Sequence, residues 1–352
     1  MTALSSSTLL PSSVRDAFAP TVTYLNTASC GLLPTTVLAA VTAADQRRAS
    51  GEFDIPGVDA AIATSRAAYG RLVGTDADHV AIGTQVSQLV GLIAESLPEG
   101  ANVLVPEGEF NSVLWPFLAR PDLNVRTVPL RELADAIRPG DALVAASVVQ
   151  SADGSVLDMP EVVGAAHAHG ARVLFDLSQA AGWLPVHDTG ADWLVCGGYK
   201  FLLGPKGSAF LSATDEAFDS LRPIGASWYS GFDPWQTCYD GPLRQADNAR
   251  RFDLSPVWPS WIGHVPAFEL LESVGIEAIH RHNVALANRL RAGLGLAPGN
   301  SAIVSFEAAP EAAARLRAAK VIGAMRAGRL RLAVHLNNTE ADIDRALDAL
   351  AG

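Results

Sequence analysis

The sequence of 352 residues is poor in lysine and cysteine. Its three lysines are Lys200, Lys206 and Lys320, so any chemistry that needs an amine nucleophile has three candidates. The three cysteines, at positions 30, 196 and 238, form no CxxC pair. This excludes a disulfide framework and indicates reduced thiols, which are typical of a cytoplasmic protein.

Positive charge and long apolar runs are also scarce. The net charge of −11 argues against binding to nucleic acid or to an anionic membrane, because phosphate neutralisation needs clustered basic residues. No apolar run reaches the roughly 18 residues of a membrane helix, and the N-terminus lacks the basic start of a signal peptide. No HExxH, GxSxG, GxGxxG or Walker motif occurs, and the histidine pairs lie two residues apart, so we expect no metal site.

Among the features that the sequence does contain, the most informative is the segment from position 171 to 207. An apolar run ends at Asp176, and a second, at 193–196, ends in a Gly-Gly-Tyr-Lys turn that contains Lys200. Both runs are predicted to be buried strands. In open α/β sheets ligands bind at the carboxyl ends of the strands, so an acid and an amine are expected at one ligand site.

Pyridoxal 5′-phosphate (PLP) is a cofactor that suits this pair. A lysine forms its Schiff base, and a carboxylate keeps its pyridine nitrogen protonated so that the ring acts as an electron sink. Lys200 is followed by three apolar residues, whereas Lys206 follows a Gly-Pro turn and Lys320 ends a helical run. Desolvation would favour Lys200 as the nucleophile. A lone lysine at a loop edge and a strand-end cap at Asp176 are the structural alternatives.

The order of elements predicts an α/β fold. Strands alternate with helices between positions 79 and 211, which indicates a mostly parallel central sheet flanked by helices. The turn 83–85 precedes a helix at 86–97 and could bind a phosphate. We predict a lead at 1–20, a large domain at 21–255 and a smaller α+β domain at 256–352. The aromatic segment 224–239 is expected to be an irregular loop that faces the substrate or an interface.

Three motifs carry a family resemblance: F-D-x-S-Q-A-A-G at 175–182, G-Y-K at 198–200 and G-P-x-G at 204–207. They resemble those of the class V aminotransferase and cysteine desulfurase family, with some kynureninase-like features. The resemblance extends over nearly the whole chain. It implies the PLP-transferase fold of type I, a small amino-acid substrate and a homodimer with shared active sites.

The resemblance also implies a role for each matching residue. Lys200 would carry the Schiff base and Asp176 would face the pyridine nitrogen, which makes them the catalytic residues. Arg331 would bind the substrate carboxylate, and segment 26–31, with Asn26 and Ala28, would line the substrate side. The other cofactor contacts would be Thr84, Gln85 and Tyr199 at the phosphate, Gln179 at the ring hydroxyl, Phe110 stacked on the ring, Ser151 from the neighbouring strand end, and Ser255 from the segment where a second subunit contributes.

Two departures from the family pattern bear on function. Desulfurases carry a mobile catalytic cysteine before the carboxylate-binding arginine, but segment 321–330 contains none. Gly197-Gly198 replaces a serine that usually contributes to phosphate binding. We therefore expect an aminotransferase, with a lyase that cleaves a C–S or C–C bond as the alternative. A non-catalytic PLP-fold binding module is a further possibility.

Overall fold

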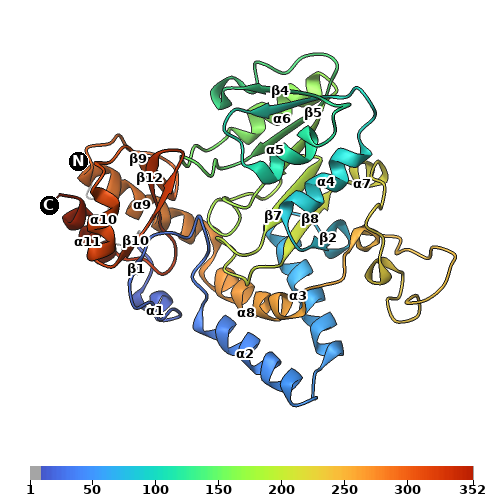
Figure 1. The fold of residues 1–352 in the computed structure, drawn as a ribbon, viewed down its shortest axis with the longest axis horizontal. Coiled ribbons are helices and arrows are strands. Elements are labelled where there is room, and N and C mark those ends of the chain that lie inside the picture. The colour runs from blue at the N-terminus through green and yellow to red at the C-terminus, as the bar shows by residue number, and fades with distance from the viewer. Residues whose placement is uncertain (1–8, 352) are drawn as a thin grey trace.

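A seven-stranded sheet lies at the centre of the molecule (Figure 1). The computed structural model describes residues 9–351, so the first eight residues of the predicted lead lie outside the described part. The strand order is β2-β8-β7-β6-β5-β3-β4, and only β8 runs antiparallel to its neighbours. The predicted mostly parallel sheet is therefore confirmed. The strands are β2 (Val80–Gly83), β3 (Asn102–Pro106), β4 (Asn124–Val128), β5 (Asp141–Ser147), β6 (Arg172–Asp176), β7 (Trp193–Gly197) and β8 (Ala209–Ala213).

Helices cover both faces of this sheet because its inner strands are apolar on both sides. In β6, Val173 and Phe175 belong to one hydrophobic cluster and Leu174 to the other, as expected where side chains alternate across a strand. The first cluster includes side chains of α2 (Thr35–Ala49), α3 (Ile55–Val73), α6 (Met159–Ala168) and α8 (Trp258–Val274). The second includes side chains of α4 (Val86–Ser96), α5 (Asn111–Leu118) and α7 (Asp215–Asp219).

A smaller unit at the C-terminal end contains a three-stranded antiparallel sheet, in the order β11-β12-β9. Its elements are α9 (Ile276–Gly293), β9 (Ile303–Phe306), α10 (Ala312–Ala318), β10 (Val321–Ile322), β11 (Ala324–Arg326), β12 (Arg329–Ala333) and α11 (Glu340–Ala351). The N-terminal strand β1 (Thr23–Tyr24) pairs with β10, as Figure 1 shows, and α1 (Ser12–Arg15) precedes it. Because β1 pairs with β10 of the smaller unit and the chain then continues into α2 of the larger one, the chain crosses between the two units more than once. The domain boundary near residue 255 stays a prediction.

Strands β11 and β12 form a hairpin that the sequence analysis does not predict. Its two turn residues, Ala327 and Gly328, have φ angles of 47° and 76°. Positive φ at both positions matches the twist of a two-residue hairpin. Leu330 and Leu332 on β12 are buried, which fixes the register of the strand. Segment 321–330 is therefore regular structure.

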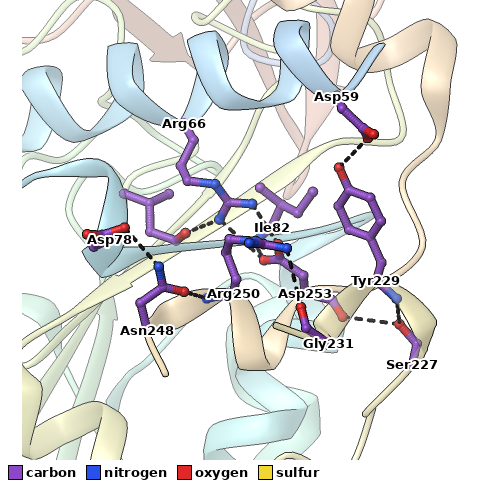
Figure 2. A network of polar contacts seen from close by, with 11 residues as sticks. Asp59, Arg66, Asp78, Ile82, Ser227, Tyr229, Gly231, Asn248, Arg250 and Asp253 are labelled. Atoms are coloured by element: carbon purple, nitrogen blue, oxygen red, sulfur yellow. Dashed lines mark hydrogen bonds and ion pairs between the residues drawn. The ribbon is translucent and has the colours of Figure 1, made fainter. Parts of the chain in front are cut away.

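The aromatic segment 224–239 is largely irregular, as predicted, and its Ser227 hydroxyl donates at 3.3 Å to the carbonyl of Asp253, which belongs to a buried ion pair (Figure 2). Arg66 on α3 donates to Asp253 over 2.6 Å, and Asp253 also accepts the backbone N–H of Ile82 at 2.8 Å. A second arginine nitrogen donates to the carbonyl of Val80. Val80 and Ile82 lie on β2, at the edge of the sheet, so this pair satisfies the edge strand's outward-facing backbone groups.

The described residues show neither a membrane-spanning helix nor a metal cluster. None of the helices in residues 9–351 is long and apolar enough to cross a bilayer. In the same range, no group of three or more histidine, cysteine or acidic side chains is arranged to hold a metal ion.

Candidate active site

The predicted acid and amine lie at the carboxyl ends of neighbouring parallel strands. Asp176 ends β6, where it is in register with Ser147 at the end of β5 and with Val195 on β7. Lys200 follows the end of β7 by three residues. The topology therefore brings these side chains to one edge of the sheet, which confirms that both strands are buried and that both end where predicted.

Asp176 is held by a serine that the sequence analysis did not single out. The backbone N–H and the hydroxyl of Ser178 both donate to its Oδ1, at 2.8 and 2.5 Å. The same hydroxyl accepts the N–H of Gly197 at 2.8 Å, which ties the end of β6 to the end of β7. Burial raises the pKa of Asp176, and the positive charge of Lys200 offsets part of that rise.

Lys200 is a buried amine, 7% exposed. Its Nζ lies 5.2 Å from the ring centroid of Phe110 and 5.9 Å from that of Tyr199. No hydrogen bond or ion pair to Nζ occurs within residues 9–351. Burial lowers its pKa, and Asp176 offsets part of that drop. A larger share of neutral, nucleophilic amine follows from the same desolvation.

The loop that carries Lys200 packs on a buried histidine, which accounts for one glycine before the lysine, Gly198, and one after it, Gly204. A Cβ on Gly198 would lie 2.3 Å from Nε2 of His264, and one on Gly204 would lie 2.1 Å from Cε1 of the same ring. Nε2 of His264 shares a 2.6 Å hydrogen bond with Ser208. Burial lowers the pKa of His264 to about 3, so the ring stays neutral. Glycine is needed at 198 for packing.

A second line of contacts joins Gln179 to Arg331. The side-chain amide of Gln179 donates to the carbonyl of Ala28 at 2.9 Å and to the hydroxyl of Ser151 at 3.2 Å. Arg331 donates to that hydroxyl at 3.1 Å and to the carbonyl of the same serine. Four of the predicted site residues therefore form one connected group.

Arg331 is buried without an acid. It is 1% exposed, and a 2.8 Å hydrogen bond to the hydroxyl of Ser29 completes its set of partners, all of which are neutral. Within the described part of the chain, no carboxylate forms an ion pair with it. Burial, helped by nearby Arg326, lowers its pKa to about 10. An unpaired buried cation is costly unless a ligand supplies the anion.

Phe110 partly covers the site from the end of β3. The ring is 44% exposed, and the neighbouring Glu109 is buried. Glu109 accepts the N–H of Phe110 at 2.7 Å, the hydroxyl of Ser147 at 2.5 Å and the amide of Gln150 at 3.0 Å. Burial raises the pKa of Glu109, which these donors partly counteract. The carboxylate fixes the loop that presents the ring.

The remaining predicted residues are less closely tied to this group. Thr84 donates to Gln88 at 2.9 Å, while Gln85 is exposed just before α4. A Cβ on Gly197 would contact both Val86 and Tyr199, so the start of α4 does border the Lys200 loop.

Two more residues of the prediction were placed with fewer contacts. The Oδ1 atom of Asn26 is buried with no hydrogen-bond partner among residues 9–351. Ser255 is exposed and makes no hydrogen bond to the other predicted site residues within that range.

Sequence reasoning missed three contributors: Glu109, Ser178 and His264. Ser178 lies inside the F-D-x-S-Q motif, and Glu109 directly precedes Phe110, so both were within reach of a motif-based prediction. His264 carries no such signal, and Ser29 was expected only as part of segment 26–31, without a named role. Their roles depend on contacts with Arg331 and with the Lys200 loop, which are distant in sequence.

Comparisons with known proteins identify the family. The family model "Aminotransferase class-V" matches residues 79–316. An uncharacterized aminotransferase, YcbU of Bacillus subtilis, is 30% identical over 310 residues, which cover 82% of each chain. The isopenicillin N epimerase of Streptomyces clavuligerus is 27% identical over 95% of this chain and 96% of its own.

The fold is shared with a solved structure of the cystine C-S lyase C-DES. The TM-score is 0.85 at 23% identity, and the match covers 94% of this chain and 97% of the other. With the buried lysine, the strand-end acid and the family model in agreement, the chain belongs to the class V aminotransferase family of PLP-dependent enzymes.

Proposed function

We propose that this enzyme is an aminotransferase that acts on a small amino acid. The observation that carries the proposal is Arg331, a buried guanidinium with only neutral partners in the described residues. Such a group binds a carboxylate through two parallel hydrogen bonds. An amino-acid substrate supplies that carboxylate next to its α-carbon, within the same pocket region as Lys200.

The residues present fit PLP. Asp176 is a buried acid suited to face a protonated ring nitrogen, and the exposed face of Phe110 is available for stacking. The Oε1 atom of Gln179 is buried and has no hydrogen-bond partner within residues 9–351, so an acceptor is left for a ring hydroxyl. We propose that Lys200 holds the cofactor through its amine, with Thr84, Gln85 and Tyr199 on the phosphate side.

Each protein group then has a defined task. When bound, PLP supplies an electron sink for the substrate α-carbon. Arg331 orients the substrate through its carboxylate, which places the α-hydrogen near Lys200. Once the substrate amine has taken its place on the cofactor, the partly desolvated Nζ of Lys200 would take that proton and deliver it to a carbon other than the α-carbon, as aminotransfer requires. Asp176, fixed by Ser178, keeps its charge directed at the ring nitrogen.

The hairpin β11–β12 supports aminotransfer over desulfuration. Together with β10 it makes up segment 321–330, where the resemblance places a mobile catalytic cysteine in desulfurases, and the segment contains no cysteine. Its turn at Ala327 and Gly328 is of the tight two-residue kind. The segment therefore offers neither the thiol nor the flexible loop that persulfide chemistry would use.

A homodimer is part of the proposal. Ser255 is exposed and unconnected to the other site residues of its own chain within the described range, so its proposed cofactor contact requires a second subunit. Exposed aromatic side chains on the anchored segment support an interface there: Phe232, Trp235 and Tyr239. Light scattering of the purified protein tests this directly.

The test of the activity is spectroscopic. The holoenzyme is titrated with single amino acids while its visible absorbance is followed. An aminotransferase loses the visible band on adding the amino acid and regains it on adding a 2-oxo acid, with stoichiometric formation of the new amino acid. Steady release of ammonia and a 2-oxo acid without loss of the band would show a lyase instead. Exchange of the α-hydrogen with solvent alone would show an epimerase.

A further inference from the structure

Three arginines lie on one face of the hairpin β11–β12. Arg326 is paired with Arg329 across the two strands, and Ala324 is paired with Arg331. Cross-strand partners point to the same face, and residues two apart on one strand do so as well. The guanidinium groups of Arg326, Arg329 and Arg331 are therefore on the same side of the sheet, while Leu330 lies on the other.

Within the described residues, only one of these three arginines has an acidic partner. Arg329 forms an ion pair with Glu307 at 3.3 Å. Arg326 donates to its neighbour's carbonyl, that of Met325, at 2.7 Å, and no carboxylate pairs with it within residues 9–351. The chain carries a net charge of −11, so acids are plentiful elsewhere. Two cations without acids are thus gathered at this face.

Arg326 and Arg331 converge on the same atom. Arg331 donates to the hydroxyl of Ser29 at 2.8 Å, and Arg326 donates to it at 3.1 Å. Two guanidinium groups bonded to one oxygen are close neighbours, and their mutual repulsion contributes to the lowered pKa of Arg331. Arg331 is buried, whereas Arg326 is exposed to solvent on the hairpin.

We infer that Arg326 binds a second carboxylate, so that the preferred substrate is an amino acid whose side chain ends in a carboxylate. The inference rests on the proposed function, because it takes Arg331 as the site of the α-carboxylate. Arg326 lies next to Arg331 and closer to solvent, so it would bind a carboxylate at the end of the substrate side chain. A hydroxyl shared by both guanidinium groups keeps them at the short spacing that suits the two carboxylates of a four- or five-carbon dicarboxylic acid.

The hairpin gives this second group a fixed position. Arg326 directly precedes the Ala327-Gly328 turn, and Leu330 and Leu332 anchor the returning strand in the core. A guanidinium on a rigid turn loses less conformational freedom when it binds an anion. An uncharged side chain in the substrate would leave Arg326 in water, at little cost. Arg326 would therefore raise the affinity for dicarboxylates without lowering the affinity for other amino acids.

The experiment measures binding without catalysis. The holoenzyme is titrated calorimetrically with succinate and glutarate, and with butyrate as the monocarboxylate of similar length. None of these ligands has an amine, so no reaction with the cofactor is possible. We expect at least one dicarboxylate to bind about tenfold more tightly than butyrate, and Arg326→Gln to remove that difference while leaving butyrate unchanged. Arg329→Gln, whose arginine already has Glu307, is the matched control and should leave the difference intact.

Two results would overturn the inference. Equal binding of dicarboxylates and butyrate by the unmodified holoenzyme would show that there is no second carboxylate site. An equal loss for all ligands in Arg326→Gln would show that Arg326 serves the same carboxylate as Arg331. The proposed function fails separately, when amino acids leave the visible absorbance unchanged in an enzyme that still binds the dicarboxylates.

Discussion

Two buried arginines, Arg66 and Arg331, have opposite surroundings. Arg66 lies against the Asp253 carboxylate at 2.6 Å, and together they satisfy the edge strand β2, as Figure 2 shows. Arg331 is as deeply buried, yet all its partners in the described residues are neutral oxygens of Ser29 and Ser151. One cation is neutralised by the fold, and for the other we propose that a ligand supplies the anion.

The difference teaches how to separate structural from functional charges in this fold. A buried ion pair loses little when no ligand is present, because each charge has its partner. A buried cation without an acid lowers stability, and it is retained where binding requires it. Lys200 belongs to the second kind, since its Nζ has no hydrogen bond or ion pair within residues 9–351. The following changes should affect the two kinds in different ways.

The largest effect is expected for Lys200. Lys200→Ala should lower the activity by a factor of about 10³ or more, because both cofactor attachment and proton transfer depend on its amine. The visible absorbance of the purified protein should disappear as well. Lys206→Ala is the matched control and should keep the band. A Lys200→Ala protein that still shows the band would contradict the assignment.

Breaking the Arg66–Asp253 ion pair should affect stability rather than catalysis. Asp253→Asn leaves the buried Arg66 without its counter-charge and should lower the free energy of unfolding by about 3–5 kcal/mol, measured in urea. Adding Arg66→Met to that variant should recover much of the loss, because the buried charge is then gone. The folded fraction should keep the catalytic constants of the parent enzyme. A large change in kcat at full folding would contradict the structural role.

A change at Arg331, in contrast, should affect substrate binding rather than stability. Arg331→Met removes an uncompensated buried charge, so the free energy of unfolding should stay the same or rise. Substrate binding should weaken about 100-fold, which corresponds to about 2.7 kcal/mol, because the carboxylate loses its charged partner. Spectral titration with an amino acid and urea unfolding of the same sample give both values. A marked loss of stability would mean that Arg331 is structural.

Buried histidines give a smaller and pH-dependent effect. Burial lowers the pKa of His264 and of His335 to about 3. In the unfolded chain the same groups titrate near 6.5, so below that pH the unfolded state binds protons that the folded state does not. Each histidine therefore makes its full contribution to the free energy of unfolding above pH 6.5. As the pH is lowered from 6.5 towards 3, that contribution falls by about 1.4 kcal/mol per pH unit for each histidine.

A single variant isolates one of these contributions. His264→Gln should reduce the slope of the unfolding free energy against pH between 6 and 4 by about 1.4 kcal/mol per unit. The absolute stability at pH 8 is a separate quantity, since the new side chain packs differently against Gly198 and Gly204. An unchanged slope would show that His264 is protonated in the folded state.

Much of the architecture could be predicted because apolar runs and turn residues, which are local in the sequence, mark its strands and helices. The apolar runs that end at Asp176 and before Gly197 are true buried strands, and the alternation of strands and helices does form a mostly parallel sheet. The small hairpin at 324–333 was missed. Its first strand has three residues, two of them exposed, and such a strand has no hydrophobic signature.

The sequence by itself determined the strands and their ends, because a buried strand requires an apolar run. It also determined the chemical types of the central groups, since Asp176 and Lys200 follow such runs. Only the tertiary structure decided that Arg331 pairs with no acid among residues 9–351, that Arg326 reaches the same serine, and that His264 requires glycine at 198. These features arise from segments more than fifty residues apart in the chain. The physical reason is that charge compensation and close packing depend on neighbours in space, which a linear pattern does not record.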